Sequence, residues 1–411
     1  MERRRFLIGC GAGAALFASS KWRMMASPLS NLLPADNDHT FVLLFLRGGC
    51  DGLQLLAPIS DAHYQDARPK SLKLSDGQGY RIDQEYQHTG FSFHPEASAL
   101  KELYDNKDLA IIHACGLTNG TRSHFDAMHL IERGIEKNTS GHEGWMARYL
   151  KAIDSKSYIP GVSVSANLAD SFTGYGKASS IKNLADYNLM EGLRVPQLIK
   201  RMYSGDPIMG SAADQTLETV KYLQTNLTEG QRADLERGVQ GYPDDWSSRE
   251  LSRSLQTVAQ LIKMDAGSKI INVDYGGWDT HERQANVFPN LVKGLSESIG
   301  AFYNDIAAKK DNVTVLVMSE FGRRLRANKS GGTDHGHGNF MMALGGKVNG
   351  GNMYGEWPGL HPKTLDRGVD LAVTTDYRNV LANILRESMQ FNDSGLIFPG
   401  FEDYADLGFI Q

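Results

Sequence analysis

The chain has 411 residues, of which 41% are hydrophobic and 22% are charged, and its formal net charge is −5. This balance predicts a globular protein with room for one large domain or two ordinary ones. The mildly acidic composition argues against nucleic acid as a partner, because nucleic-acid-binding domains carry a strong basic bias.

The N-terminus has the layout of an export signal. Three arginines at positions 3–5 precede an apolar run over 6–18, which is too short to span a membrane. The stretch RRRFL also matches the twin-arginine signal of proteins that are exported folded. We expect residues 1–35 to be a signal peptide and linker, with the twin-arginine export machinery as a partner. The rest of the chain is then periplasmic or secreted, and not an integral membrane protein.

Short apolar runs bounded by turn residues predict the strands of a sheet. Their near-continuous apolar character is typical of strands covered on both faces, as in a parallel sheet. Four runs are clear, a fifth follows a glycine-rich loop, and a sixth is weaker. In chain order they are 40–46, 109–114, 161–165 (the weaker one), 269–275, 313–318 and 339–345 (the fifth).

Helical patterns separate these strands. The clearest, 290–309, repeats apolar residues at spacings of three and four and joins two of the strands, which indicates a βαβ crossover. We therefore predict a three-layer α/β/α sandwich with a mostly parallel central sheet, formed by a single domain over 36–411. The segment from about 183 to 263 has no strong strand signal and is interpreted as a helical insertion.

Two cysteines, Cys50 and Cys115, lie near the ends of predicted strands. An oxidising compartment allows a disulfide between them. Two buried thiols are the alternative, and the sequence leaves both open.

Acidic and histidine side chains gather in the loops that follow or precede the predicted strands. Each alone has an ordinary alternative, such as an aspartate in a glycine turn or a surface acid beside an arginine. Together they would lie at one edge of the sheet, where α/β proteins place functional loops. Imidazole and carboxylate ligands suit zinc, and also manganese or iron, so we expect one or two divalent metal ions. The seven candidate ligands are Asp51, Asp279, His281, Glu320, Asp334, His335 and His337.

Hydroxyl groups and an arginine follow the second strand. Ser123 stands at the start of a predicted helix, where a serine is usually an N-cap. The same position suits an anion or an activated nucleophile, because free backbone N–H groups favour negative charge there. Thr121 and Thr118 are rival nucleophiles, and Arg122 could clamp an anionic group.

The spaced motifs LRGGCDGL, RSHF, GGWDTH, SEFGR and GTDHGHG, behind a twin-arginine signal, resemble those of the DUF1501 family of exported bacterial proteins. That family is usually grouped with the alkaline phosphatase and sulfatase superfamily, whose members are largely metal-dependent hydrolases of phosphate and sulfate esters. The resemblance implies an alkaline phosphatase-like fold. It also implies that Asp51, Asp279 and His281 bind metal and that Ser123 is the nucleophile.

One position departs from the superfamily pattern. Its Ser-Asp-His-Gly-like motif corresponds here to SEFG, so that Glu320 replaces an aspartate and Phe321 replaces a histidine. Either His335 or His337 supplies the missing ligand, or the second metal is absent. We expect a metal-dependent hydrolase of small anionic esters, with zinc favoured over manganese, calcium or magnesium. The alternative is a non-catalytic periplasmic binding or assembly protein on a degenerate hydrolase fold.

Overall fold

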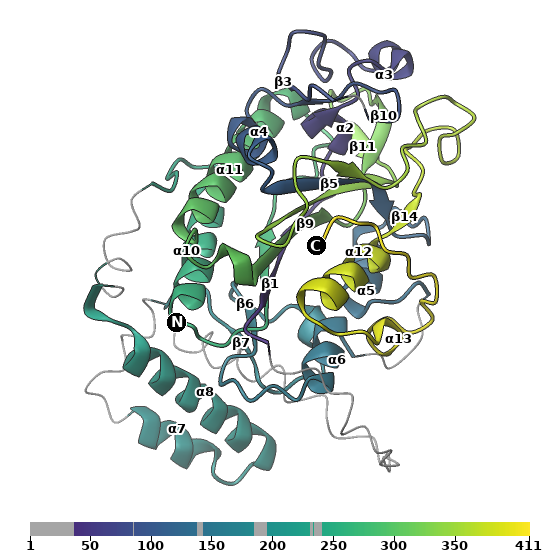
Figure 1. Cartoon of the computed structure of the whole chain (residues 1–411). Helices are drawn as coiled ribbons and strands as arrows, with labels where there is room; N and C mark the ends of the chain where they lie inside the picture. Colours follow the sequence, from purple (N-terminus) through teal and green to yellow (C-terminus); the bar gives the residue numbers. More distant parts are fainter. Residues whose placement is uncertain (1–36, 85, 138–142, 185–194, 231–232, 234–240) are drawn as a thin grey trace.

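The computed structural model describes residues 37–84, 86–137, 143–184, 195–230, 233 and 241–411 (Figure 1). The predicted signal segment, 1–35, lies outside these residues. No helix in the described part of the chain combines the length and the apolar character that a bilayer crossing requires.

A large, mostly parallel sheet forms the centre of the molecule, and it contains all six predicted strands. The described residues contribute nine strands, in the order β13-β5-β12-β9-β1-β8-β6-β7 with β14 beside β5. Only β12 runs antiparallel, against both β5 and β9. The strands are β1 (Thr40–Leu46), β5 (Leu109–Gly116), β6 (Gly161–Ser163), β7 (Ala178–Ser180), β8 (Ile270–Tyr275), β9 (Val313–Ser319), β12 (Asn339–Gly345), β13 (Met353–Tyr354) and β14 (Thr375–Asp376).

Helices cover both faces of this sheet, which confirms the predicted mixed α/β class (Figure 1). One face carries α4 (Ser98–Asp105), α10 (Arg249–Lys263) and α11 (Gln284–Asp305). The other carries α5 (His124–Arg133), α6 (Trp145–Ala152), α12 (Tyr377–Asn383) and α13 (Ser394–Ile397). Helix α11 joins β8 to β9, which pair in parallel with opposite sides of β1, so the predicted βαβ crossover is present.

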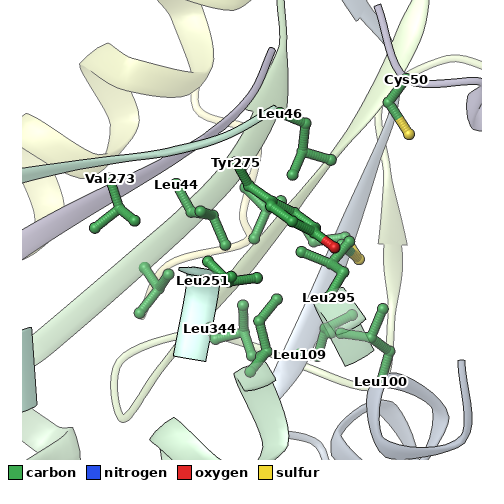
Figure 2. Packing of buried hydrophobic residues seen from close by; sticks show 14 of the residues in the cluster. Leu44, Leu46, Cys50, Leu100, Leu109, Leu251, Val273, Tyr275, Leu295 and Leu344 are labelled. Atoms are coloured by element: carbon green, nitrogen blue, oxygen red, sulfur yellow. The ribbon is translucent and has the colours of Figure 1, made fainter. Parts of the chain in front are cut away.

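The central strand shows why the apolar runs are nearly continuous. Along β1, Val42, Leu44 and Leu46 pack into the core beneath α10 and α11. Phe41, Leu43 and Phe45 point the other way, into the core beneath α5 and α6. Successive side chains of a strand alternate between faces, and here both faces are buried. Figure 2 shows the first of these cores, with Leu44, Leu46, Leu251 and Leu295 packed together.

Smaller elements surround the sheet. Along the chain, β9 and β12 are separated by two short strands, β10 (Arg323–Ala327) and β11 (Thr333–His335). These two form a separate antiparallel pair. The short strands β2 (Leu56–Ala57), β3 (Tyr80–Arg81) and β4 (Ser92–Phe93) form a separate sheet near α2 (Gly52–Leu55) and α3 (Ala62–Ala67). Between 195 and 263 the described residues form α7 (Val195–Tyr203), α8 (Pro207–Asn226) and α10.

Cys50 and Cys115 are both buried and free. The structure therefore agrees with the alternative of two buried thiols. Burial raises the pKa of each thiol well above its ordinary value, so neither is a thiolate at neutral pH.

Candidate metal centre

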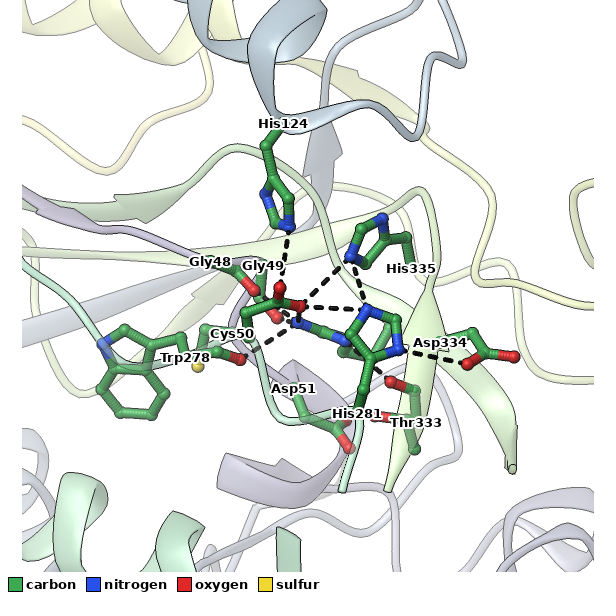
Figure 3. A network of polar contacts seen from close by, with 12 residues as sticks. Gly48, Gly49, Cys50, Asp51, His124, Trp278, His281, Thr333, Asp334 and His335 are labelled. Atoms are coloured by element: carbon green, nitrogen blue, oxygen red, sulfur yellow. Dashed lines mark hydrogen bonds and ion pairs between the residues drawn. The ribbon is translucent and has the colours of Figure 1, made fainter. Parts of the chain in front are cut away.

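The loops that could carry chemistry meet at one edge of the main sheet. The parallel strands β1, β8 and β9 end there, β5 leads there into the start of α5, and the antiparallel β12 begins there. The β10–β11 pair lies over this edge because its second strand leads directly into β12. Segments far apart in the sequence thus deliver polar side chains to one place (Figure 3).

Three histidines and one aspartate converge at this edge. His124, Asp279 and His335 each offer a ligand atom, and these atoms lie within 4.8 Å of one another. His281 joins them, because its Nε2 lies 3.1 Å from Oδ1 of Asp279 and 2.8 Å from Nε2 of His335. We call these four residues the three-histidine cluster. Figure 3 shows the three rings around a common point.

Each of the three imidazoles is held in place by a hydrogen bond at its Nδ1 atom. Nδ1 of His124 lies 2.7 Å from Glu320 Oε1, and Nδ1 of His281 lies 3.2 Å from Asp334 Oδ1. Nδ1 of His335 lies 2.8 Å from the carbonyl oxygen of Arg122. A carbonyl or an ionised carboxylate can only accept, so each Nδ1 carries the hydrogen and donates it.

This arrangement leaves the Nε2 lone pairs facing the cluster. Among the described residues, Nε2 of His124 is buried without a hydrogen-bond partner, and Asp279 Oδ2 is 3.5 Å from it. The Nε2 atoms of His281 and His335 face each other at 2.8 Å, where two lone pairs repel. Metal-ligating histidines usually donate their second ring N–H to a carboxylate or a carbonyl, as all three do here. The residues therefore fit a divalent cation at their centre.

Hydrogen bonds and a neighbouring positive charge keep the carboxylates of Asp279 and Glu320 ionised. Burial alone would raise the pKa of Asp279, but the hydrogen bond and charge of Arg323 outweigh it and lower that pKa to about 2. Burial likewise opposes ionisation of Glu320, but hydrogen bonds from His124 and from backbone N–H groups hold its pKa below the ordinary value. The hydrogen bond to Glu320 in turn raises the pKa of His124.

Phe321 occupies the position at which the Ser-Asp-His-Gly-like motif carries a histidine. Its side chain is only 2% exposed, and its ring lies 4.9 Å from those of both His124 and His335. It acts as an apolar spacer that holds these two imidazoles in place. His335, and not His337, is the histidine of the glycine-rich loop that reaches the cluster.

A wide cleft opens beside the cluster. It has a volume of about 1300 Å³, and its wall includes His124, Thr121, Asp279 and Glu320. The exposed ring of Phe125 and the segment 165–170 form other parts of the wall. A ligand pocket for a drug-sized molecule is roughly 300–1,000 Å³, so this cleft has room for a substrate larger than a simple ester.

Two of the seven candidate ligands, Asp51 and His337, are bonded to residues outside the cluster. Asp51 is fully buried, and Arg68 and Gln284 occupy both of its carboxylate oxygens. His337 donates from Nε2 to the carbonyl oxygen of Leu117, 2.7 Å away. The predicted convergence of all seven is thus wrong: other partners bind Asp51 and His337, and of the seven candidates only Asp279, His281 and His335 belong to the cluster. Glu320 and Asp334 lie behind the histidines, as acceptors of their Nδ1–H groups.

The residues predicted to bind the anion or to act as nucleophile have other contacts in the structure. Arg122 does not face the cleft, because Asp366 and Asp370 hold its guanidinium in ion pairs. Ser123 is the N-cap of α5, since its side chain accepts a hydrogen bond from the backbone N–H of Asp126. Thr121 lines the cleft, and its hydroxyl accepts from the backbone N–H of Ser123.

His124 is the cluster member absent from the predicted ligands. It lies in the RSHF motif at the first position of α5, directly after Ser123. In the sequence, this residue is a histidine at the start of the helix that follows the second predicted strand.

The fold and site together define a mixed α/β protein with a three-histidine cluster at the carboxyl edge of its sheet. Residues 205–396 match the family model described as "Protein of unknown function (DUF1501)". This match confirms the resemblance for that part of the chain. A comparison with curated proteins finds no match.

Solved structures give weak similarities over most of the chain. Ps i-CgsB in complex with k-i-k-neocarrahexaose is 10% identical with a TM-score of 0.38, covering 90% of this chain and 75% of that one. An alkaline phosphatase superfamily protein from Vibrio parahaemolyticus is 11% identical with a TM-score of 0.34, covering 84% and 69%. A mutant of TAB5 alkaline phosphatase with bound magnesium is 12% identical with a TM-score of 0.30, covering 74% and 90%.

Proposed function

We propose that this protein is a metal-dependent hydrolase of phosphate or sulfate esters, with the three-histidine cluster as its metal site. One observation carries the proposal. Three imidazoles have their Nδ1–H groups bonded to fixed acceptors, and their Nε2 atoms converge beside the carboxylate of Asp279. Three histidines with a carboxylate suit zinc best among the common divalent ions.

A divalent ion at this position would lower the pKa of a water molecule and neutralise negative charge on the ester group. The chain supplies the rest of the site. Asp279, with Arg323 behind it, stays ionised and holds one side of the cluster. Glu320 orients His124 from the interior, and the cleft beside both gives the substrate its approach.

Water is the nucleophile that the contacts favour. The hydroxyl of Ser123 accepts a hydrogen bond from the first turn of α5, as an N-cap does. We also propose export through the twin-arginine machinery, on the strength of the N-terminal pattern alone.

The proposal is tested by metal analysis and by an ester panel. We expect the purified protein to retain close to one divalent ion per chain and to hydrolyse aryl phosphates or aryl sulfates. A chelator should remove both the ion and the activity, and added zinc should restore both. A protein that binds no divalent ion, or one whose hydrolysis survives complete metal removal, contradicts the proposal.

A second function, that of a non-catalytic binding or assembly protein, is favoured by one observation. The two residues expected to act on an anionic group, Ser123 and Arg122, are engaged in an N-cap and in ion pairs. A protein that holds its metal ion yet hydrolyses no ester in a broad panel would support this alternative.

The Ser123→Ala variant separates a water nucleophile from a serine nucleophile. We expect it to lose about 0.5–2 kcal/mol of stability, the usual cost of removing an N-cap. Its rate of ester hydrolysis should stay within a few-fold of the wild type. Denaturant unfolding measures the first quantity and initial rates measure the second. An activity loss of several orders of magnitude would instead identify Ser123 as the nucleophile.

A further inference from the structure

A buried arginine lies directly behind the three-histidine cluster. The side chain of Arg323 has no solvent exposure. Its guanidinium donates to five oxygens that come from the ends of different strands. They are the carbonyl oxygens of Gly48, Gly49, Trp278 and Thr333, at 2.5–3.1 Å, and Oδ1 of Asp279, at 2.6 Å.

Such a set of oxygens is what a hard cation would use. Carbonyl and carboxylate oxygens from several loops, converging on one buried point, resemble the ligands of a divalent ion. Here the positive charge is a guanidinium that belongs to the chain and is always protonated. A metal ion cannot share these oxygens, because the guanidinium already fills the space between them and its charge would repel the ion.

The strand-end aspartate is neutralised in the same way. Arg68 binds both oxygens of Asp51, at 2.6 and 2.9 Å, and neither side chain has any solvent exposure. Arg68 also donates to the carbonyl oxygens of Leu325 and Arg324 in β10. The pair thus fastens the end of β1 to the β10–β11 pair, whose last residue is His335.

We infer that this edge of the sheet binds a single metal ion, and that Arg68 and Arg323 stand in place of a second. The inference rests on the proposed metal site and specifies its count. Asp279 is the one carboxylate of the cluster, whereas Asp51 has a structural role, because its buried pair with Arg68 fastens the end of β1. Arg323 is a positioning residue, because it orients Asp279 through Oδ1 without reaching the cleft.

Matched isosteric variants test this assignment. Zinc content and zinc dissociation constant are measured by titration for the wild type, for Asp51→Asn and for Asp279→Asn. We expect one zinc ion per chain in the wild type and in Asp51→Asn, with similar affinity but a lower melting temperature for the variant. Asp279→Asn should weaken zinc binding by more than about 100-fold, because even the loss of an outer partner costs about 10–100-fold.

A second variant covers the case in which Asp51→Asn fails to fold. Replacing the buried pair together, as Asp51→Asn with Arg68→Met, leaves no unpaired charge, and such replacements are often tolerated. This double variant should also bind one zinc ion. Two ions in the wild type, or loss of the ion in the double variant, overturn the single-ion inference and leave the proposed function standing. A wild-type chain that binds no ion overturns the metal site itself, and the inference with it.

Discussion

Replacing His124 with alanine is expected to lower the affinity for zinc by more than about 100-fold and to abolish metal-dependent hydrolysis. His124 supplies a buried Nε2 that has no hydrogen-bond partner among the described residues. Its removal takes away a direct ligand, which should cost more than the 10–100-fold typical of an outer partner. Competition with a chelator of known affinity measures the effect.

Two further variants make this test specific. Glu320→Gln keeps His124 but weakens the acceptor of its Nδ1–H, so a smaller loss of about 10–100-fold is expected. His129→Ala removes another histidine of α5 that lines the same cleft. It should leave zinc affinity unchanged. Equal losses in His124→Ala and His129→Ala would mean that general disruption of the cleft, and not ligation, causes the effect.

Arg323→Met is expected to lower the free energy of unfolding by about 3 kcal/mol or more, because each buried acceptor left unpaired costs about 1–3 kcal/mol. The substitution keeps an unbranched apolar stem but leaves the buried acceptors of Gly48, Gly49, Trp278 and Thr333 unpaired. It also frees Asp279 from its fixed orientation. Urea unfolding monitored by circular dichroism gives the change.

The neighbouring arginine provides a matched control. The side chain of Arg324 is 45% exposed, and it lies 3.9 Å from Asp334. Exposed ion pairs contribute about 0–1 kcal/mol, so Arg324→Met should change stability by no more than that. A similar loss in both variants would contradict the role assigned to Arg323.

Local patterns were enough to predict the sheet. The runs at 40–46 and 339–345 coincide with β1 and β12, and the other four runs also form strands. Their apolar residues continue without interruption because both faces of the strands are buried, as β1 shows. The sequence did not reveal that β12 is antiparallel, since direction depends on how the chain returns through the β10–β11 pair.

The candidate site was predicted only in part. Strand-end position and residue type identified Asp279, His281 and His335, which the structure brings together, and Glu320 and Asp334 behind them. The same rule also selected Asp51, which is committed to Arg68. It overlooked His124, whose place in the cluster depends on contacts of the start of α5 with Asp279 and Glu320.

The sequence by itself determined which segments become strands and which loops carry ligand-type side chains, because both depend on residue spacing and type along the chain. The tertiary structure alone decided which of those side chains share a centre. A carboxylate such as Asp51 is available to a metal only if no buried cation reaches it first. The nearness of Arg68 to Asp51, and of Arg323 to Asp279, arises from contacts between segments 17 and 44 residues apart. Electrostatic competition at short range, set by the fold, therefore separates the carboxylate that faces the histidines from the one held in an ion pair.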